Sequence, residues 1–164
     1  MATNLRLFRN PFAFFPASLA ILPLLFSIPS SAATVRPKTP RASCRIEIDN
    51  AHLSTHFKET MGVKAVKVNA QSICNVTQSE VKLTVQIYKV GSFRDYLISE
   101  KSTNPLRPTS FGTRVENQET FKRCSSNKKS SFYGVAFSEA IIAGQKFAAP
   151  PARSPKIVSL QCGT

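Results

Sequence analysis

The stretch "EVKLTVQIYKV", residues 80–90, decides the fold class, because apolar and polar side chains alternate along it. The apolar set, on one parity, is Val81, Leu83, Val85 and Ile87. The polar set, on the other parity, is Lys82, Thr84, Gln86 and Tyr88. A period of two is typical of a β-strand with one face buried and the other exposed. The β-branched residues in the stretch also favour a strand over a helix.

Similar alternation occurs on both sides of this stretch and predicts further strands. It is found in "CRIEID" (44–49), "VKVNAQSIC" (66–74) and "KIVSLQC" (156–162). The segment "FYGVAFSEAII" (132–142) alternates aromatic and small residues and is apolar on both faces, which indicates a central strand. The segment "GSFRDYLISE" (91–100) is a weaker candidate for a short strand.

The segments between these candidates carry turn signals. We interpret "KSTNPLRPTSFGTR" (101–114) and "AAPPARSP" (148–155) as loops, because proline fixes the backbone and removes a hydrogen-bond donor. The stretch "ETFKRCSSNKKSS" (119–131) is polar and basic, and the cations within its part 122–129 are expected to lie on a loop. Short strands separated by turns predict an antiparallel all-β domain, most simply a β-sandwich that is immunoglobulin-like in outline.

The first 32 residues have the layout of a secretory signal peptide. Arg6 and Arg9 form a positive start, an apolar run covers 19–28, and small residues follow up to Ala33. A membrane anchor is disfavoured because the unbroken apolar run is shorter than the roughly 20 residues of a spanning helix. A plastid transit peptide is disfavoured by the long hydrophobic core.

Three regions follow from this reading of the N-terminus. They are a signal peptide (1–32), a basic, proline-containing flexible arm (33–42) and a single β-domain (43–164). The mature chain is expected to lack a transmembrane segment and to be secreted or associated with the cell envelope. Removing Arg6 and Arg9 lowers the net charge from +13 to +11.

All four cysteines, Cys44, Cys74, Cys124 and Cys162, lie in the predicted domain. An even number of cysteines in an exported chain predicts two disulfides, with three possible connectivities. Because three of the four lie on the inward parity of a strand, each disulfide is expected to tie core strands. We favour the sequential pairing, Cys44–Cys74 and Cys124–Cys162. Zinc binding is the alternative, which the wide spacings and the lack of a CxxC pair disfavour.

The pattern "C-x-I-x-I-D-N-x-H-x-S-T-H", then "V-x-V-N-A-x-x-x-C", "V-x-L-T-V-x-I-Y-K" and a "C…YGVA…C" tail resembles a group of small exported proteins of actinobacteria. The likeness covers roughly residues 44–162 and consists of cysteines and strands. It implies a signal peptide, a cysteine-paired β-domain and a bacterial envelope or secreted setting, and it supplies no active site. It also argues against glycosylation of the sequon at Asn75.

The two histidines, His52 and His56, lie four residues apart. On a helix they would share a face and could bind one metal ion. On an extended segment their Cα atoms would be about 13 Å apart, too far for joint chelation. Asp49-Asn50 favours a turn and Ser54-Thr55 disfavours a helix. We therefore interpret the pair as structural or solvated, with a metal site as the alternative.

Other enzyme signatures are missing from the sequence. It has no GxSxG nucleophile elbow and no GxGxxG phosphate loop, and nothing singles out two of the nine carboxylates. We therefore predict a non-enzymatic protein that needs no cofactor. The alternative is a small metal-dependent or hydrolytic secreted enzyme that uses His52 and His56.

The basic stretch "KRCSSNKK", residues 122–129, is the more specific functional feature. Its cations are Lys122, Arg123, Lys128 and Lys129. Such a cluster indicates either a solubilising loop or a site for anionic partners. Nucleic acid is the least favoured partner, because export removes it and no RNP1-like motif is present. The predicted function is an interaction module for anionic cell-surface polymers, a membrane surface or another protein.

Overall fold

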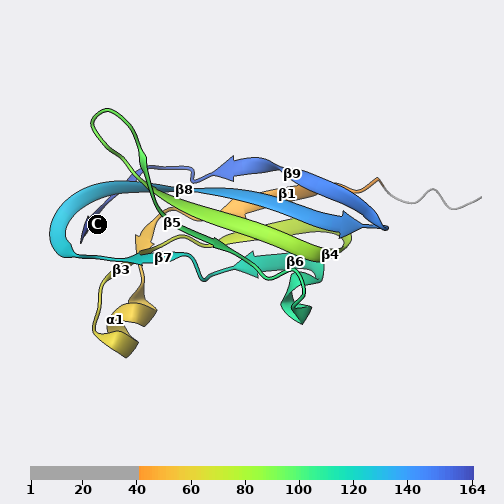
Figure 1. Cartoon of the computed structure of the whole chain (residues 1–164), viewed down its shortest axis with the longest axis horizontal. Helices are drawn as coiled ribbons and strands as arrows, with labels where there is room; N and C mark the ends of the chain where they lie inside the picture. Colours follow the sequence, from red (N-terminus) through yellow and green to blue (C-terminus); the bar gives the residue numbers. More distant parts are fainter. Residues whose placement is uncertain (1–40) are drawn as a thin grey trace, which may run out of the picture. The chain divides into compact units, whose positions relative to one another are not determined.

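The computed structural model describes residues 41–164, which hold ten strands, one α-helix and one 3-10 helix (Figure 1). The first part comprises β1 (Cys44–Ile48), β2 (His52–Leu53), α1 (Thr55–Met61), β3 (Ala65–Lys67), β4 (Ala70–Lys89) and β5 (Tyr96–Ser102). The second part comprises η1 (Pro108–Ser110), β6 (Gly112–Asn117), β7 (Phe121–Arg123), β8 (Ser126–Ile142), β9 (Gln145–Arg153) and β10 (Val158–Gly163). The predicted signal peptide (1–32) and most of the predicted arm (33–42) lie outside the described residues.

Every strand pair in residues 41–164 is antiparallel. The prediction of an antiparallel, mainly β domain is therefore confirmed. One sheet has the path β1-β4-β8-β10, with β5 and β6 also on β4 and β9 also on β8. A smaller sheet has the order β2-β3-β7.

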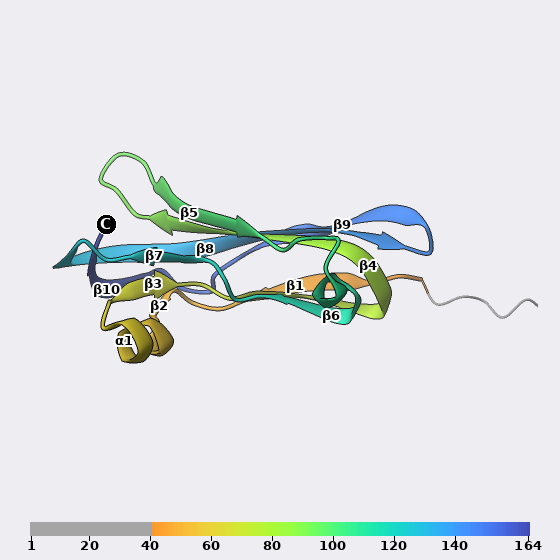
Figure 2. The ribbon, with the colours of Figure 1, turned by 60° about the horizontal axis from the view of Figure 1, so that its bottom comes forward.

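The 20-residue strand β4 organises the domain because it runs through two layers. Its first part pairs with β1 and β6, and its second part pairs with β5 and β8. Figure 2 shows β4 turning at one end, with β1 and β6 in one layer and β5, β8 and β9 in the other. The prediction of separate strands over 66–74 and 80–90 was wrong, since residues 70–89 form one strand and β3 precedes it.

A buried polar network holds the turn in β4, where the ladder registers shift. The Gln78 side chain donates from Nε2 to the Ser72 carbonyl oxygen at 3.1 Å and accepts from Ser72 Oγ at 3.1 Å. Ser138 Oγ on β8 donates to Ser72 Oγ at 2.9 Å. A shifted ladder leaves buried backbone groups without partners on the neighbouring strand. The Gln78 side chain supplies the missing partner for one of them, the Ser72 carbonyl oxygen.

The core lies between the two layers, on the face that the opening alternation predicts. Val81, Leu83, Val85 and Ile87 are all fully buried. Close packing also requires Gly134 on β8, because a Cβ there would lie 2.6 Å from the Val68 side chain and 3.0 Å from Ile48.

Strand β8 is central, as predicted, and pairs with β4, β9 and β10. It continues into β9 through Ala143 and Gly144, whose φ angles of 49° and 77° suit a two-residue hairpin turn. The predicted loop over 148–155 was wrong, because β9 runs to Arg153. Pro150 and Pro151 are tolerated there because β9 is an edge strand and its register to β8 shifts beside them.

Residues 101–114 were also predicted to be a loop, but they include the end of β5, η1 and the start of β6. The alternation of β6 is hidden in the sequence because its inward residue Asn117 is polar. The Asn117 amide donates to the carbonyl oxygens of Leu83 and Lys101, each at 2.9 Å. Its Oδ1 accepts from Glu119 N at 3.1 Å, so the buried amide has partners on both atoms.

The two predicted disulfides are present, in the sequential pairing. Cys44 joins Cys74 across β1 and β4, and Cys124 joins Cys162 on β10. All four cysteines are thereby used. Disulfides persist in oxidising compartments, so their presence indicates an extracellular or similarly oxidising setting. No helix in residues 41–164 is long and apolar enough to cross a membrane.

Candidate anion-binding site

The four cations predicted as a patch lie on two strands joined by a short corner. Lys122 and Arg123 are on β7, and Lys128 and Lys129 begin β8. All four are exposed. The expectation of a loop over 122–129 was therefore wrong. Both sides of the corner are strand, because β7 pairs with β3 and the start of β8 pairs with β10.

Strand geometry sends neighbouring cations to opposite faces. Lys122 is opposite Val66 in the ladder, whereas Arg123 is opposite Ala65 and lies beside α1, with Nη2 4.0 Å from Met61 Sδ. Lys128 and Lys129 alternate in the same way on β8. The four side chains therefore do not share one face; they lie on both faces of the strands where β7 passes into β8.

Lys64 joins this group, although the sequence pattern did not predict it. The Cys124 N–H donates to the Lys64 carbonyl oxygen at 2.9 Å, and Lys64 Nζ donates to Asn127 Oδ1 at 2.9 Å. These contacts span 60 residues or more of sequence, and only the pairing of β3 with β7 creates them. We call the five residues Lys64, Lys122, Arg123, Lys128 and Lys129 the basic end.

A shallow hollow of about 340 Å³ lies at the basic end, against the second disulfide. Its lining residues are Val63, Lys64, Cys124, Ser125, Ser126 and Asn127. Ammonium and hydroxyl groups donate hydrogen bonds to phosphate, sulfate or carboxylate oxygens. The hollow therefore has donors suited to an anionic group.

The positive charge of the domain is largely uncompensated. Arg6, Arg9, Arg36 and Lys38 lie outside residues 41–164, which leaves 18 of the 22 basic residues against all 9 acidic ones, a net charge of +9. Within the described part of the chain, the one ion pair joins Arg45 to Glu47 at 2.9 Å. None of the five cations of the basic end is paired with a carboxylate there.

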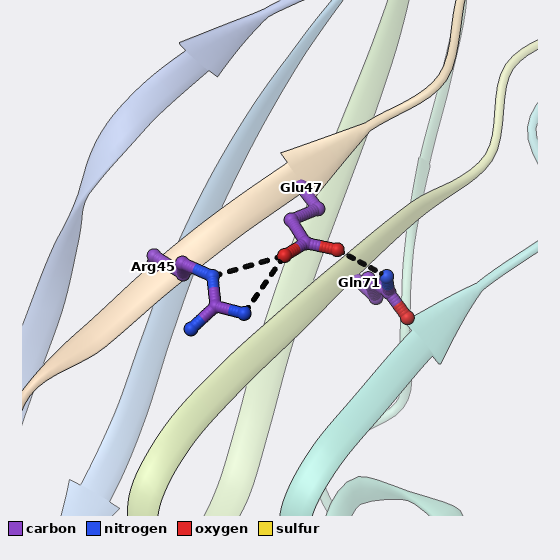
Figure 3. A network of polar contacts seen from close by, with 3 residues as sticks. All are labelled: Arg45, Glu47 and Gln71. Carbon is purple, nitrogen blue, oxygen red and sulfur yellow. Dashed lines mark hydrogen bonds and ion pairs between the residues drawn. The ribbon is translucent and has the colours of Figure 1, made fainter.

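The Arg45–Glu47 pair lies on β1, and Figure 3 shows it with Gln71 of β4. Glu47 accepts from Arg45 Nε at 2.9 Å and from Gln71 Nε2 at 2.6 Å. The pKa of the Glu47 carboxyl is lowered, most by the hydrogen bond from Arg45 and next by that from Gln71. The carboxylate is thereby held in its charged form by local partners.

The histidines occupy different elements. His52 lies on β2, with Nδ1 3.1 Å from the Asn50 carbonyl oxygen, and His56 is exposed in the first turn of α1. The expectation that Ser54 disfavours a helix was wrong, because Ser54 is the N-cap and its Oγ accepts from Phe57 N at 3.4 Å. Gly62 closes the helix in the left-handed conformation. This Ser and Gly pair is a sequence signal that could have identified α1.

The other polar groups do not converge on the histidines. Asp49 accepts from Asn69 at 3.2 Å, and Asp95 accepts from Tyr133 at 2.8 Å. Residues 41–164 contain no group of three His, Cys, Asp or Glu side chains placed to hold a metal ion. A larger cleft of about 480 Å³ lies along β8 and β9, where Lys82 faces Glu139 across the ladder.

Comparison with known protein families, with curated proteins and with solved structures finds no match to this chain.

Proposed function

We propose that this chain is an exported β-sandwich module that binds anionic polymers or surfaces of the cell envelope without catalysing a reaction. The observation that carries the proposal is the basic end, where five exposed cations have no carboxylate partner within the described residues. The two disulfides support export, since they suit an oxidising compartment. The resemblance to exported actinobacterial proteins is consistent with the same setting.

The expected binding mode is electrostatic. Exposed charges are screened over about 8 Å at physiological ionic strength, so each contact between a cation and an anionic group weakens as salt is added. Because the five cations lie on or beside β7 and the start of β8, the basic end would face the anionic partner. A polymer of phosphate groups could contact cations on both faces of β7 and β8.

The test measures binding of purified protein to polyphosphate and to anionic vesicles over a series of salt concentrations. A variant with Lys122, Arg123, Lys128 and Lys129 all changed to Gln is expected to lose most of the binding and to keep the fold, since all four side chains are exposed. A matched control changes four exposed cations elsewhere to Gln, namely Lys82, Arg107, Arg114 and Lys146. It removes the same charge and is expected to bind more tightly than the first variant.

Equal binding by the two variants would show that total charge, and not the basic end, attracts the partner. If the first variant binds as tightly as the wild type does, the proposal is wrong. Changing His52 and His56 to Ala is expected to leave binding unaltered. A loss of binding in that variant, together with wild-type binding that added zinc strengthens, would favour the metal-dependent alternative.

A further inference from the structure

The β4–β5 hairpin loop, residues 90–95, presents an apolar side chain to solvent. Phe93 at its tip is fully exposed, and Tyr96 and Leu97 beyond it are about half exposed. Figures 1 and 2 both show this loop projecting at the end of the domain that holds α1 and the start of β8, which is also the basic end. These three apolar side chains within five residues give the loop an apolar surface that a partner could bury.

The loop is held in place by contacts at both of its sides. The Val90 N–H donates to the Ser131 carbonyl oxygen on β8 at 2.9 Å. Asp95 accepts from the Tyr133 hydroxyl at 2.8 Å. A Cβ at Gly91 would lie 2.2 Å from the Arg94 carbonyl oxygen, so the tight turn requires glycine. These contacts hold the loop in the conformation that leaves the Phe93 side chain exposed.

Cations lie within the loop and on the strands that flank it. Lys89 precedes the loop and donates from Nζ to the Thr164 carbonyl oxygen. Arg94 lies within the loop, with its guanidinium 5.3 Å from the Tyr96 ring centre. Lys129 is two residues from the Ser131 carbonyl that anchors the loop. An aromatic side chain flanked by Lys and Arg is the composition of segments that lie in the headgroup region of anionic bilayers.

We propose that Phe93 inserts into the headgroup region of an anionic phospholipid bilayer while the basic end contacts the lipid phosphates. The inference rests on the proposed function and names lipid as the anionic surface. Charge complementarity selects an anionic partner, and Phe93 selects a partner with an apolar interior. A soluble polyphosphate offers the charge without any phase that could bury the ring.

The first test compares Phe93→Ser with Leu106→Ser. Leu106 is also strongly exposed, but it lies in the connection between β5 and η1. With vesicles of phosphatidylglycerol and phosphatidylcholine in equal parts, Phe93→Ser is expected to lower the partition coefficient about tenfold, the equivalent of about 1.4 kcal/mol. Leu106→Ser is expected to bind as the wild type does. Both variants are expected to bind polyphosphate as the wild type does.

The second test uses fluorescence, because the chain contains no tryptophan. Phe93→Trp and Leu106→Trp each introduce a single reporter. On addition of the same vesicles, emission from the Phe93→Trp variant is expected to shift to the blue and to be quenched by brominated lipid. Emission from the Leu106→Trp variant is expected to stay unchanged. An unshifted, unquenched Phe93→Trp signal at saturating lipid would overturn the inference.

The outcomes separate this inference from the proposed function. If Phe93→Ser binds vesicles like the wild type while the four-cation variant binds neither vesicles nor polyphosphate, the membrane inference is wrong and the proposed function stands. An equal loss of vesicle and polyphosphate binding in Phe93→Ser also overturns the lipid assignment. If the four-cation variant binds both probes normally, the proposed function itself fails.

Discussion

The Tyr133 hydroxyl on β8 donates a 2.8 Å hydrogen bond to Asp95 Oδ2 in the β4–β5 loop. The Tyr133 ring stacks on the Tyr88 ring of β4, with ring centres 5.2 Å apart. The guanidinium of Arg153, on β9, lies 3.8 Å from the centre of the Tyr133 ring. One side chain thus connects the loop that carries Phe93 to three strands. The pKa of Tyr133 is raised above its ordinary value of 10.0, mainly by burial and next by the hydrogen bond to Asp95.

The raised pKa predicts a late step in an alkaline titration. The folded protein holds the Tyr133 proton more tightly than the unfolded chain does. The stability from this group is therefore complete below pH about 10 and is lost as the pH rises through the raised pKa. Tyrosinate absorbance should show one of the three tyrosines titrating after the others. In Tyr133→Phe the late step should disappear; if it persists, it belongs to another tyrosine.

The turn in β4 predicts a difference between two glutamines on the same strand. Gln78→Ala leaves the Ser72 carbonyl and hydroxyl without their buried partner, at a cost of about 1–3 kcal/mol in the free energy of unfolding. Gln86→Ala removes a partly buried side chain that donates to Glu100 and accepts from the Tyr88 hydroxyl. It should cost about 1 kcal/mol or less, because water can replace these partners. Urea unfolding of both variants measures the difference. Equal costs would mean that Gln78 does not hold the turn.

The buried amide of Asn117 predicts a pH-dependent variant. Asn117→Asp keeps the shape but removes the two N–H donors to Leu83 and Lys101, so a charged carboxylate would face two carbonyl oxygens. The expected loss is about 3 kcal/mol or more at neutral pH. Burial raises the pKa of such an aspartate, so the loss relative to wild type should shrink as the pH falls toward about 4. Unfolding measured at both pH values checks this; a loss that is independent of pH would contradict it.

The reading of residues 1–32 as a signal peptide predicts a processed N-terminus. Exported protein should begin near Ala33 or Thr34, after the small residues that follow the apolar run. N-terminal sequencing of protein recovered outside the cytoplasm measures this directly. Exported material that retains Met1 would contradict the reading.

Much of the fold was predictable because strand burial has a simple period. The alternation over 80–90 identified the core face, and the sequence also indicated that residues 132–142 form a central strand. The errors have physical causes that a local pattern does not contain. Residues 70–89 form one strand because Gln78 satisfies the groups at the shifted ladder, and residues 148–153 form a strand because β9 is an edge that accepts proline.

The candidate site was predictable only in part. The four cations in 122–129 were visible as a charge cluster, but their division between two faces depends on strand alternation in a stretch that lacks an apolar pattern. Lys64 was missed because its contacts with Cys124 and Asn127 arise from pairing between distant segments. Phe93 had no signal in the sequence, since its exposure follows from the anchored turn that begins at Gly91.

The two disulfides predict a contribution to stability that can be measured by removing one of them. Cys124–Cys162 joins residues 38 apart and Cys44–Cys74 joins residues 30 apart, so each should contribute on the order of 3–4 kcal/mol by restricting the unfolded chain. Thiol titration of the denatured, non-reduced protein should find no reactive cysteine, and peptide mapping should recover these two links. Changing Cys124 and Cys162 together to Ser should lower the free energy of unfolding by about that amount. Recovery of a Cys44–Cys162 peptide would contradict both pairings. An unchanged free energy of unfolding in the double variant would contradict the stabilising role of the Cys124–Cys162 link.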